Sequence, residues 1–337
     1  MKITVKSIIA TMLITSLFTG CSSNEANNTT TEATAETSST EMQKPTGGGL
    51  GGSSVDTSAI TNQYLDIAYA TVSESQKLDI YLPNEGEEPF PVIIAIHGGA
   101  FKMGNRTGGG LTAMLEGVNH GYAVVCVDYR LSGEAIFPAA VNDVKAAIRY
   151  IYSHASEYNL NPDKIATWGD SAGGNLASIA GTTSGTNDLY DSSLGMENVS
   201  DKITAVVDWF GPLDFLSMDQ QFQDSGIMPV FGLTSSESSP ESSYIGQLIT
   251  DAPELTEQAN PETYISEDDP AFLIQHGTAD GNVPTQQSIN FSDALVKVIG
   301  EDKVQLTLLE GVAHGGEAFE SESNLELVFE FLDKYMK

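Results

Sequence analysis

The sequence predicts an α/β fold in which helices cover a mostly parallel β-sheet. Short apolar runs alternate with amphipathic helical patterns along most of the chain, as in proteins built from β–α–β units. The run at residues 91–96 is apolar throughout, as expected of a strand buried on both faces of a parallel sheet. The chain has 337 residues, 40% hydrophobic and 18% charged, which suits one large globular domain.

The predicted elements follow one another in a regular order within one domain, which we place at residues 63–337. A polar turn at residues 72–75 joins the first two strands, and no internal repeat is present. In chain order, strands are expected at 64–70, 76–82, 91–96, 122–127, 164–168, 203–210, 271–275 and 304–309, and helices at 139–152, 174–180, 286–299 and 325–335.

Residues 212–265 interrupt this alternation. They contain nine acidic residues and no Lys or Arg, together with apolar clusters such as residues 227–231. Connections of this length inside a compact domain are usually functional, so we expect a lid or binding insertion. The alternative is a surface excursion without a function.

The first twenty residues have the pattern of a signal peptide. Lys2 and Lys6 precede an apolar core at residues 8–18, which is too short to span a bilayer. The sequence around Cys21 resembles the lipobox of bacterial lipoproteins, with Phe18 where that motif prefers Leu. The resemblance implies an acylated Cys21 and a membrane-anchored protein outside the cytoplasm; the alternative is an ordinary secretory signal.

Composition and charge narrow the function further. Residues 21–62 are rich in Ser, Thr, Asn, Glu and Gly, which predicts a disordered tether. The formal charge of −31, from 46 acidic and 15 basic residues, repels phosphate backbones, so we expect no nucleic-acid partner. Cys21 and Cys126 do not form a disulfide framework, and Cys126 is expected to be buried in a strand.

A candidate nucleophile lies at Ser171. Residues 169–173 read Gly-Asp-Ser-Ala-Gly and fall between a predicted strand and a predicted helix. On such a turn the glycines allow the backbone to crowd and the serine hydroxyl to project above the sheet. The N-terminus of the helix favours negative charge at that point. The alternative is a Gly/Ser-rich connection.

Candidate oxyanion donors follow the most apolar strand, in the stretch His97-Gly98-Gly99-Ala100. Its glycines allow main-chain N–H groups to point into a cleft. We expect the N–H groups of Gly99, Ala100 and Ala172 to stabilise a tetrahedral oxyanion. His97 is expected to hold the loop by hydrogen bonds rather than to act as the base.

The candidate base is one of five histidines, at positions 97, 120, 154, 276 and 314. His314 stands in a Gly-rich loop after the last predicted strand, and Asp280 stands in the loop after the preceding strand. The chain order Ser171, Asp280, His314 is the order found in α/β-hydrolases. His276 closes a strand, and we expect it to be a packed residue.

Four further residues lie near these motifs. Three of them have two possible interpretations, and the fourth is expected to have a structural role. Asp170 either makes hydrogen bonds that fix the turn or perturbs the nucleophile beside it. Arg130 is expected to pair with a buried acid. Trp209 and Phe210 end a strand next to the insertion, and they either line an acyl pocket or belong to the core.

Together these stretches resemble carboxylesterases of the α/β-hydrolase fold, in the group that includes hormone-sensitive-lipase-like enzymes, and most of all its acetyl and feruloyl esterase-like branch. The resemblance implies Ser171 as nucleophile, Asp280 and His314 as its partners, and Gly99 with Ala172 in the oxyanion hole. Ala100 replaces the usual third glycine but keeps its N–H. Many relatives carry an N-terminal helical cap, which residues 63–90 lack, so the resemblance leaves that role to residues 212–265. The matching stretches are residues 77–83, 97–101, 128–131, 137–140, 169–174, 276–280 and 312–315.

The expected reaction is hydrolysis of a carboxylic ester through an acyl-enzyme, with no metal or organic cofactor. The acidic insertion disfavours carboxylate-bearing substrates, so we expect neutral, short-acyl esters, including acetylated or feruloylated carbohydrates. The alternatives are a serine peptidase of the prolyl-oligopeptidase type and an inactive binding lipoprotein. The chain has no room for the β-propeller that such peptidases usually carry, and the complete Ser, His and Asp set argues against an inactive site.

Overall fold

The computed structural model describes residues 54–337. The predicted signal peptide at 1–20, Cys21 and residues 21–53 of the predicted tether lie outside the described residues. No helix within the described range is long and apolar enough to cross a membrane.

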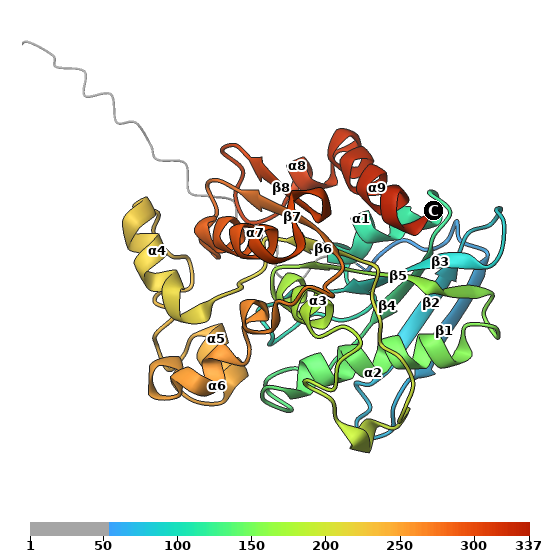
Figure 1. Cartoon of the computed structure of the whole chain (residues 1–337), viewed down its shortest axis with the longest axis horizontal. Coiled ribbons are helices and arrows are strands. Elements are labelled where there is room, and N and C mark those ends of the chain that lie inside the picture. Colours follow the sequence, from blue (N-terminus) through green and yellow to red (C-terminus); the bar gives the residue numbers. More distant parts are fainter. Residues whose placement is uncertain (1–53) are drawn as a thin grey trace, which may run out of the picture. The chain divides into compact units, whose positions relative to one another are not determined.

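The described part of the chain forms one eight-stranded sheet in the order β1-β2-β4-β3-β5-β6-β7-β8 (Figure 1). β1 and β2 pair antiparallel, as do β2 and β4, and all other neighbours are parallel. The predicted α/β fold with a mostly parallel sheet is therefore confirmed. The strands are β1 (Asn62–Ala68), β2 (Lys77–Leu82), β3 (Phe90–Ile96), β4 (Ala123–Val127), β5 (Leu160–Asp170), β6 (Ala205–Trp209), β7 (Ala271–Gly277) and β8 (Val304–Leu309).

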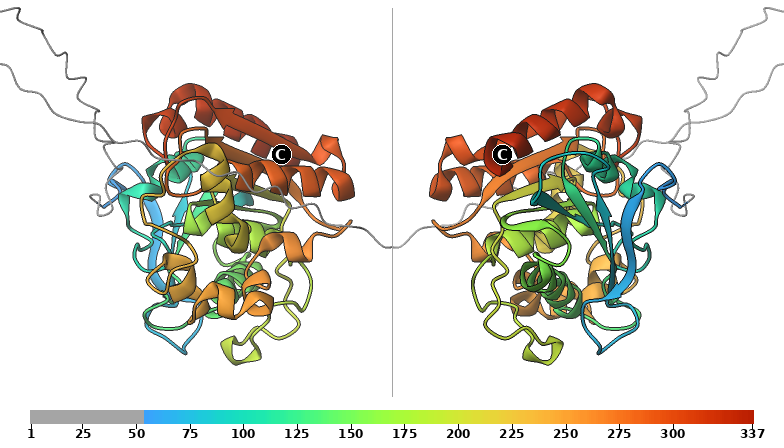
Figure 2. Two further views of the ribbon diagram at one scale, coloured as in Figure 1. Left: turned by 90° about the vertical axis from the view of Figure 1, so that its left-hand side faces the viewer. Right: turned by 90° about the vertical axis from the view of Figure 1, so that its right-hand side faces the viewer.

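Helices cover both faces of this sheet. α2 and α9 lie on opposite sides of it, as Figures 1 and 2 show. Short 3₁₀ turns join several of the elements. The α-helices are α1 (Thr112–Leu115), α2 (Ala139–His154), α3 (Ala172–Thr182), α4 (Met218–Ser225), α5 (Pro240–Ile245), α6 (Pro253–Glu257), α7 (Gln286–Ile299), α8 (Glu317–Glu320) and α9 (Glu322–Met336).

Each face of the sheet contributes to its own apolar core. β3 shows the division, because Ile94 packs with the core formed with α2, α3 and α7, while Ile93 packs with the core formed with α1 and α9. Both side chains are fully buried. Burial on both faces explains why the strand at 90–96 is apolar without alternation.

The prediction of a disordered tether at residues 21–62 is wrong for residues 54–62, because these residues make defined contacts with the folded domain. The N–H of Val55 donates to the Thr107 carbonyl at 3.0 Å, and the N–H of Thr61 donates to Asn84 Oδ1 at 2.9 Å. Val55 and Ile60 pack against the core. These two apolar side chains anchor a segment whose composition is otherwise that of a linker.

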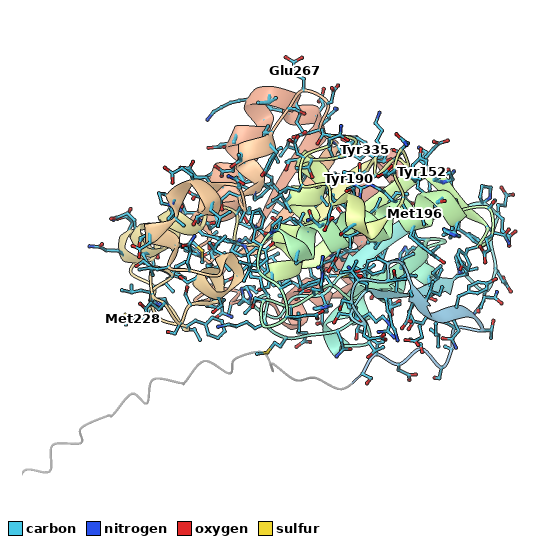
Figure 3. All side chains as sticks on the ribbon, turned by 90° about the horizontal axis from the view of Figure 1, so that it is seen from below. Tyr152, Tyr190, Met196, Met228, Glu267 and Tyr335 are labelled. Atoms are coloured by element: carbon cyan, nitrogen blue, oxygen red, sulfur yellow. The ribbon has the colours of Figure 1, made fainter. Side chains whose placement is uncertain are left out.

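The insertion at 212–265 connects β6 to β7 and contains α4, α5 and α6, which lie together at one end of the molecule in Figure 1. Some of its apolar side chains are buried, such as Phe215 and Tyr244, but Met228 projects from the edge of the fold, where Figure 3 labels it. Cys126 on β4 is buried as predicted, and burial raises the pKa of its thiol.

Candidate active site

The turn between β5 and α3 holds Ser171 in an unusual backbone conformation. β5 ends at Asp170 and α3 begins at Ala172, so a single residue makes the turn, with φ 53° and ψ −120°. A non-glycine residue at positive φ is strained and is often found at functional sites. A Cβ at Gly173 would collide with the carbonyl oxygen of Ile96, so the tight turn requires glycine there. This crowding explains the Gly-x-Ser-x-Gly spacing.

Three loops at the ends of β5, β7 and β8 bring Ser171, Asp280 and His314 together. Ser171 Oγ lies 2.8 Å from His314 Nε2, and His314 Nδ1 lies 2.6 Å from Asp280 Oδ2. The serine and the histidine are 143 positions apart in the sequence. The three side chains therefore form one continuous hydrogen-bonded chain.

Asp280 is fully buried and held at both carboxylate oxygens. Its Oδ1 accepts hydrogen bonds from the N–H groups of Asn282 at 2.7 Å and Val283 at 3.0 Å. Burial alone would raise the pKa of Asp280, but the neighbouring His314 and His276 outweigh burial and hold that pKa below its usual range. The carboxyl is thus an anion that faces the Nδ1 atom of His314.

The loop after β3 places backbone N–H groups at the same cleft. Gly99 and Ala100 line the cleft with Ser171, and both have positive φ, 120° and 56°. Among the hydrogen bonds of residues 54–337, the N–H groups of Gly99 and Ala100 have no acceptor. Ala172 is the first residue of α3, so its N–H has no partner within the helix. Ala172 directly follows Ser171, and the oxyanion role of these three N–H groups stays a prediction.

Asp170 ties the serine turn to this loop. Its Oδ1 accepts a hydrogen bond from the N–H of Gly98 at 2.8 Å. Burial raises the pKa of Asp170 to about 6, although the hydrogen bond from Gly98 and the charge of His314 act in the opposite direction. The interpretation of Asp170 as a residue that fixes the turn agrees with this contact.

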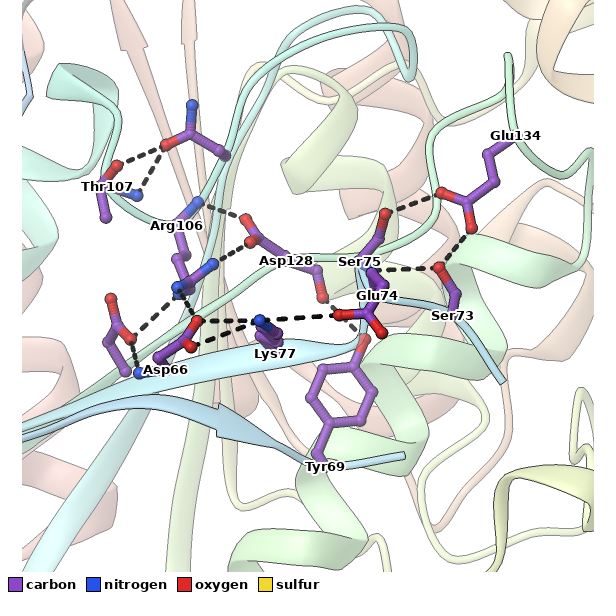
Figure 4. Close-up of polar contacts among 12 residues, drawn as sticks. Asp66, Tyr69, Ser73, Glu74, Ser75, Lys77, Arg106, Thr107, Asp128 and Glu134 are labelled. Carbon is purple, nitrogen blue, oxygen red and sulfur yellow. Dashed lines mark hydrogen bonds and ion pairs between the residues drawn. The ribbon is translucent and has the colours of Figure 1, made fainter. Parts of the chain in front are cut away.

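Arg106 braces the far end of the same loop and was not predicted from the sequence. Its guanidinium pairs with Asp128, with Asp79 at 3.0 Å and with Asp66 at 2.9 Å (Figure 4). Its backbone N–H also donates to Asp128 Oδ1 at 2.6 Å. The loop is thereby fastened to β1, β2 and the end of β4. Three carboxylates from separate segments have no common sequence pattern that would indicate such a cluster.

His97 and Arg130 have structural positions, as the sequence predicted. The His97 ring stacks on Tyr129 at 4.4 Å, and its Nδ1 lies 2.8 Å from the Gly98 carbonyl. Burial lowers the pKa of His97. Arg130 pairs with the buried Asp143 through Nε at 2.8 Å and Nη2 at 2.7 Å. Neither side chain reaches Ser171.

The cleft around Ser171 has a volume of about 400 Å³ and an aromatic wall. Trp209 and Phe210 line it and are also almost fully buried, so they belong both to the core and to the wall of the cleft. The Phe210 ring lies 4.6 Å from the His314 ring and 4.6 Å from the Phe319 ring. Residues that line the cleft without having been predicted include Phe231, Asn282, Phe319 and Glu320.

His276 is packed, as predicted, but it also contacts the candidate triad. Its Nε2 lies 3.2 Å from Asp280 Oδ2. The four-residue spacing of the two side chains, at a strand end and in the following loop, is the only signal for this contact in the sequence. Across residues 54–337, no group of three His, Cys, Asp or Glu side chains is placed to hold a metal ion.

Comparison with known proteins finds esterases. The chain is 32% identical over 235 residues to the probable carboxylic ester hydrolase LipM of Mycobacterium tuberculosis, an alignment that covers 69% of this chain and 52% of that protein. The chain therefore spans about half the length of this relative. Isoprenylcysteine alpha-carbonyl methylesterase-like proteins of Arabidopsis thaliana are also similar, with 29% identity for one that is covered to 48% of its length.

Two solved structures are similar in sequence and in fold. One is a truncated form of a carbohydrate esterase from gut microbiota, with 30% identity, a TM-score of 0.76 and coverage of 84% of this chain and 99% of that one. The other is a bifunctional GH43-CE protein of Bacteroides eggerthii, with 34% identity, a TM-score of 0.73 and coverage of 82% and 38%. The BD-FAE family model matches residues 78–295, which is more than half of the chain. The chain thus belongs to the BD-FAE family and has the fold of the α/β-hydrolase carboxylesterases.

Proposed function

We propose that this protein is a serine esterase that hydrolyses carboxylic esters through an acyl-enzyme. The observation that carries the proposal is the hydrogen-bonded chain from Ser171 Oγ through His314 to Asp280, with distances of 2.8 and 2.6 Å. This arrangement suits a nucleophile, a base and a group that orients the base. The esterase relatives support the same reaction class.

In the proposed reaction, His314 Nε2 takes the proton of Ser171 as its oxygen attacks the ester carbonyl. The buried anion of Asp280 orients the imidazole and stabilises the charged form that results. His314 then gives the proton to the leaving alcohol. A water molecule, activated by the same imidazole, releases the acyl group from Ser171.

The negative charge on the carbonyl oxygen is greatest in the tetrahedral intermediate. We assign its stabilisation to the N–H groups of Gly99, Ala100 and Ala172, which lie beside Ser171 without intramolecular acceptors in the described structure. Each preorganised donor of this kind lowers the barrier by about 3–4 kcal/mol. Because the loop and the turn are held together through Asp170 and Gly98, these donors require little rearrangement during the reaction.

The proposed substrates are esters with short acyl groups, including acetyl or feruloyl groups on carbohydrates. The cleft of about 400 Å³ is large enough for a small acyl group and part of an alcohol. Glu320 at its rim, Asp170 beside the nucleophile and the insertion without basic residues repel a carboxylate-bearing substrate. The similarity to a carbohydrate esterase from gut microbiota supports a carbohydrate as the alcohol.

Replacing the nucleophile tests the proposal directly. Ser171→Ala is expected to lower kcat on p-nitrophenyl acetate by about 10⁴ to 10⁶ and to leave the fold intact, since it removes only a hydroxyl. A fluorophosphonate probe should label the wild-type protein and Ser192→Ala, which changes an exposed serine outside the cleft, but not Ser171→Ala. Retention of most of the activity or of the label by Ser171→Ala would refute the assignment. A wild-type protein that resists the probe would indicate an inactive site.

A further inference from the structure

His276 is a second imidazole in contact with the carboxylate of Asp280. It extends the series of contacts that runs from Ser171 through His314 to Asp280. It is the penultimate residue of β7 and is fully buried. Its Nε2 lies 3.1 Å from the Val283 carbonyl oxygen and 3.2 Å from Asp280 Oδ2. Asp280 Oδ2 is therefore placed between two imidazoles, His314 at 2.6 Å and His276 at 3.2 Å.

The neighbours of His276 determine where its proton lies. Both groups that face Nε2, a carbonyl and a carboxylate, can only accept hydrogen bonds, so Nε2 carries the proton. On the other side, Nδ1 lies 2.6 Å from Ser288 Oγ on α7, and a hydroxyl can donate to it. His276 is thus satisfied as a neutral imidazole with its N–H directed at Val283 and Asp280.

These contacts constrain the rotation of the Asp280 carboxylate. Oδ1 is held by the N–H groups of Asn282 and Val283, in the turn that follows Asp280. The N–H of His276 fixes the carbonyl of that same turn and presents a partial positive charge to Oδ2. Loss of His276 would leave Oδ2 with His314 alone and would leave the buried Val283 carbonyl without this donor.

We propose that His276 is a positioning residue for catalysis, which keeps Asp280 Oδ2 directed at Nδ1 of His314. This inference rests on the proposed function, because it concerns the same triad. His276 does not contact Ser171 and does not line the cleft, although its ring lies 6.5 Å from that of Phe210, which does. Its polar contact with the triad is the one to Asp280, so it acts through Asp280. The expected consequence of losing it is a lower kcat rather than weaker substrate binding.

The test is a double-mutant cycle measured with p-nitrophenyl acetate. His276→Leu, which is apolar and of similar size, is expected to lower kcat about tenfold to a hundredfold, since small misplacements of catalytic groups cost that much. KM should stay within about twofold of the wild-type value, because the cleft is unchanged. His276→Gln, which offers an amide N–H near the place of Nε2, should restore most of the lost kcat. His154→Gln, on α2 outside the site, serves as the matched histidine control.

The decisive measurement is the effect of His276→Leu in an Asp280→Asn background. If His276 acts through Asp280, the second substitution should lower kcat by less than about twofold further, because the losses of residues acting as a unit do not multiply. If the kcat losses of the two substitutions multiply in the double variant, the role of His276 is overturned and the proposed function is not affected. An Asp280→Asn enzyme that keeps most of its activity would overturn the proposed function itself, and the inference with it.

A milder variant keeps the test informative if His276→Leu does not fold. Ser288→Ala removes only the hydroxyl that faces Nδ1 and so weakens the preference for a proton on Nε2. It should lower kcat a few-fold with KM unchanged, and this loss should also disappear in the Asp280→Asn background. An unchanged kcat in Ser288→Ala, or a loss that persists with Asp280→Asn, would contradict the proposed role of His276.

Discussion

The base and the tip of the insertion at 212–265 differ in the burial of their apolar side chains. We call residues 212–222 and 239–265 the base and residues 227–233 the tip. In the base, Phe215, Phe222 and Tyr244 are buried and join the main core. In the tip, Met228, Val230, Phe231 and Leu233 are 46–83% exposed, although the segment carries no charge.

Different contacts account for the difference. The base is fastened by Gln287 of α7, whose Oε1 accepts from the N–H groups of Leu213 at 2.7 Å and Asp214 at 2.6 Å. The tip is linked to the loop that holds Asp280 by a hydrogen bond from the N–H of Val230 to the Gly281 carbonyl at 2.8 Å. Gly281 directly follows Asp280. The base is thus part of the folded core, whereas the tip is largely exposed and contributes Phe231 to the cleft that Ser171 also lines.

The largest expected effect comes from releasing the base. Gln287 is buried, and its Nε2 also donates to Gln221 Oε1 at 2.8 Å and Ser217 Oγ at 3.0 Å. Gln287→Ala would leave Gln221 Oε1 and the two backbone N–H groups of Leu213 and Asp214 without partners, and it would leave a cavity. We expect the free energy of unfolding to fall by about 4 kcal/mol.

Denaturant unfolding measures that loss, and limited proteolysis should show faster cleavage within residues 212–265. The matched control is Gln286→Ala, because the neighbouring Gln286 is on the same helix but makes only an exposed hydrogen bond to Asn290. The control should stay within about 0.5 kcal/mol of the wild-type protein. Equal effects of the two substitutions would show that the base is not held by Gln287.

A smaller effect on stability is expected from a change of pH, because a buried glutamic acid of the base lies close to the tip. Glu241 lies in the first turn of α5, and it lines a small cavity with Phe231 of the tip. Burial raises the pKa of Glu241 from 4.5 to about 7. The folded protein therefore keeps this proton at a pH at which the unfolded chain has lost it, so the stability that depends on Glu241 is complete at low pH and declines as the pH rises towards 7.

Glu241→Gln should remove this dependence. Between about pH 5 and pH 7 the free energy of unfolding of the wild-type protein should fall by about 2 kcal/mol relative to that of the variant. Denaturant unfolding at a series of pH values measures the difference, with the exposed Glu237→Gln as the control. Parallel stability curves for wild-type protein and Glu241→Gln would contradict a buried, neutral carboxyl at this position.

The sequence allows the strand-end geometry to be predicted better than the cleft. Strand β8 and helix α7 have their predicted bounds, because strong periodicity and a following Gly300 define them. The positions of Ser171, Asp280 and His314 follow from the rule that loops at one edge of a parallel sheet meet. Phe319 and Glu320 were missed because α8 has only four residues, too few to show a helical period. The contact of His276 with Asp280 depends on side-chain direction, which spacing alone does not determine.

The smallest effect on stability, and the one most specific to the tip, is expected from Phe231→Ala. Because Phe231 is 46% exposed, its removal should change the free energy of unfolding by no more than about 0.5 kcal/mol. A feruloyl ester fills more of the cleft than an acetyl ester and so has more apolar surface to place against this ring. We expect kcat/KM to fall about fivefold for the feruloyl ester and less than twofold for the acetyl ester, since one lost apolar contact is worth about 1 kcal/mol.

The measurement is the ratio of kcat/KM for methyl ferulate to kcat/KM for p-nitrophenyl acetate in each variant. Leu327→Ala on α9, with 40% exposure, controls for the loss of a partly exposed apolar side chain outside the cleft and should leave the ratio unchanged. Two results would contradict a role of the tip in substrate selection. In the first, Phe231→Ala changes kcat/KM for neither substrate; in the second, it lowers kcat/KM equally for both. The first would mean that the exposed apolar segment does not contact the acyl group, and the second that it supports the catalytic loop through Gly281 rather than selecting the substrate.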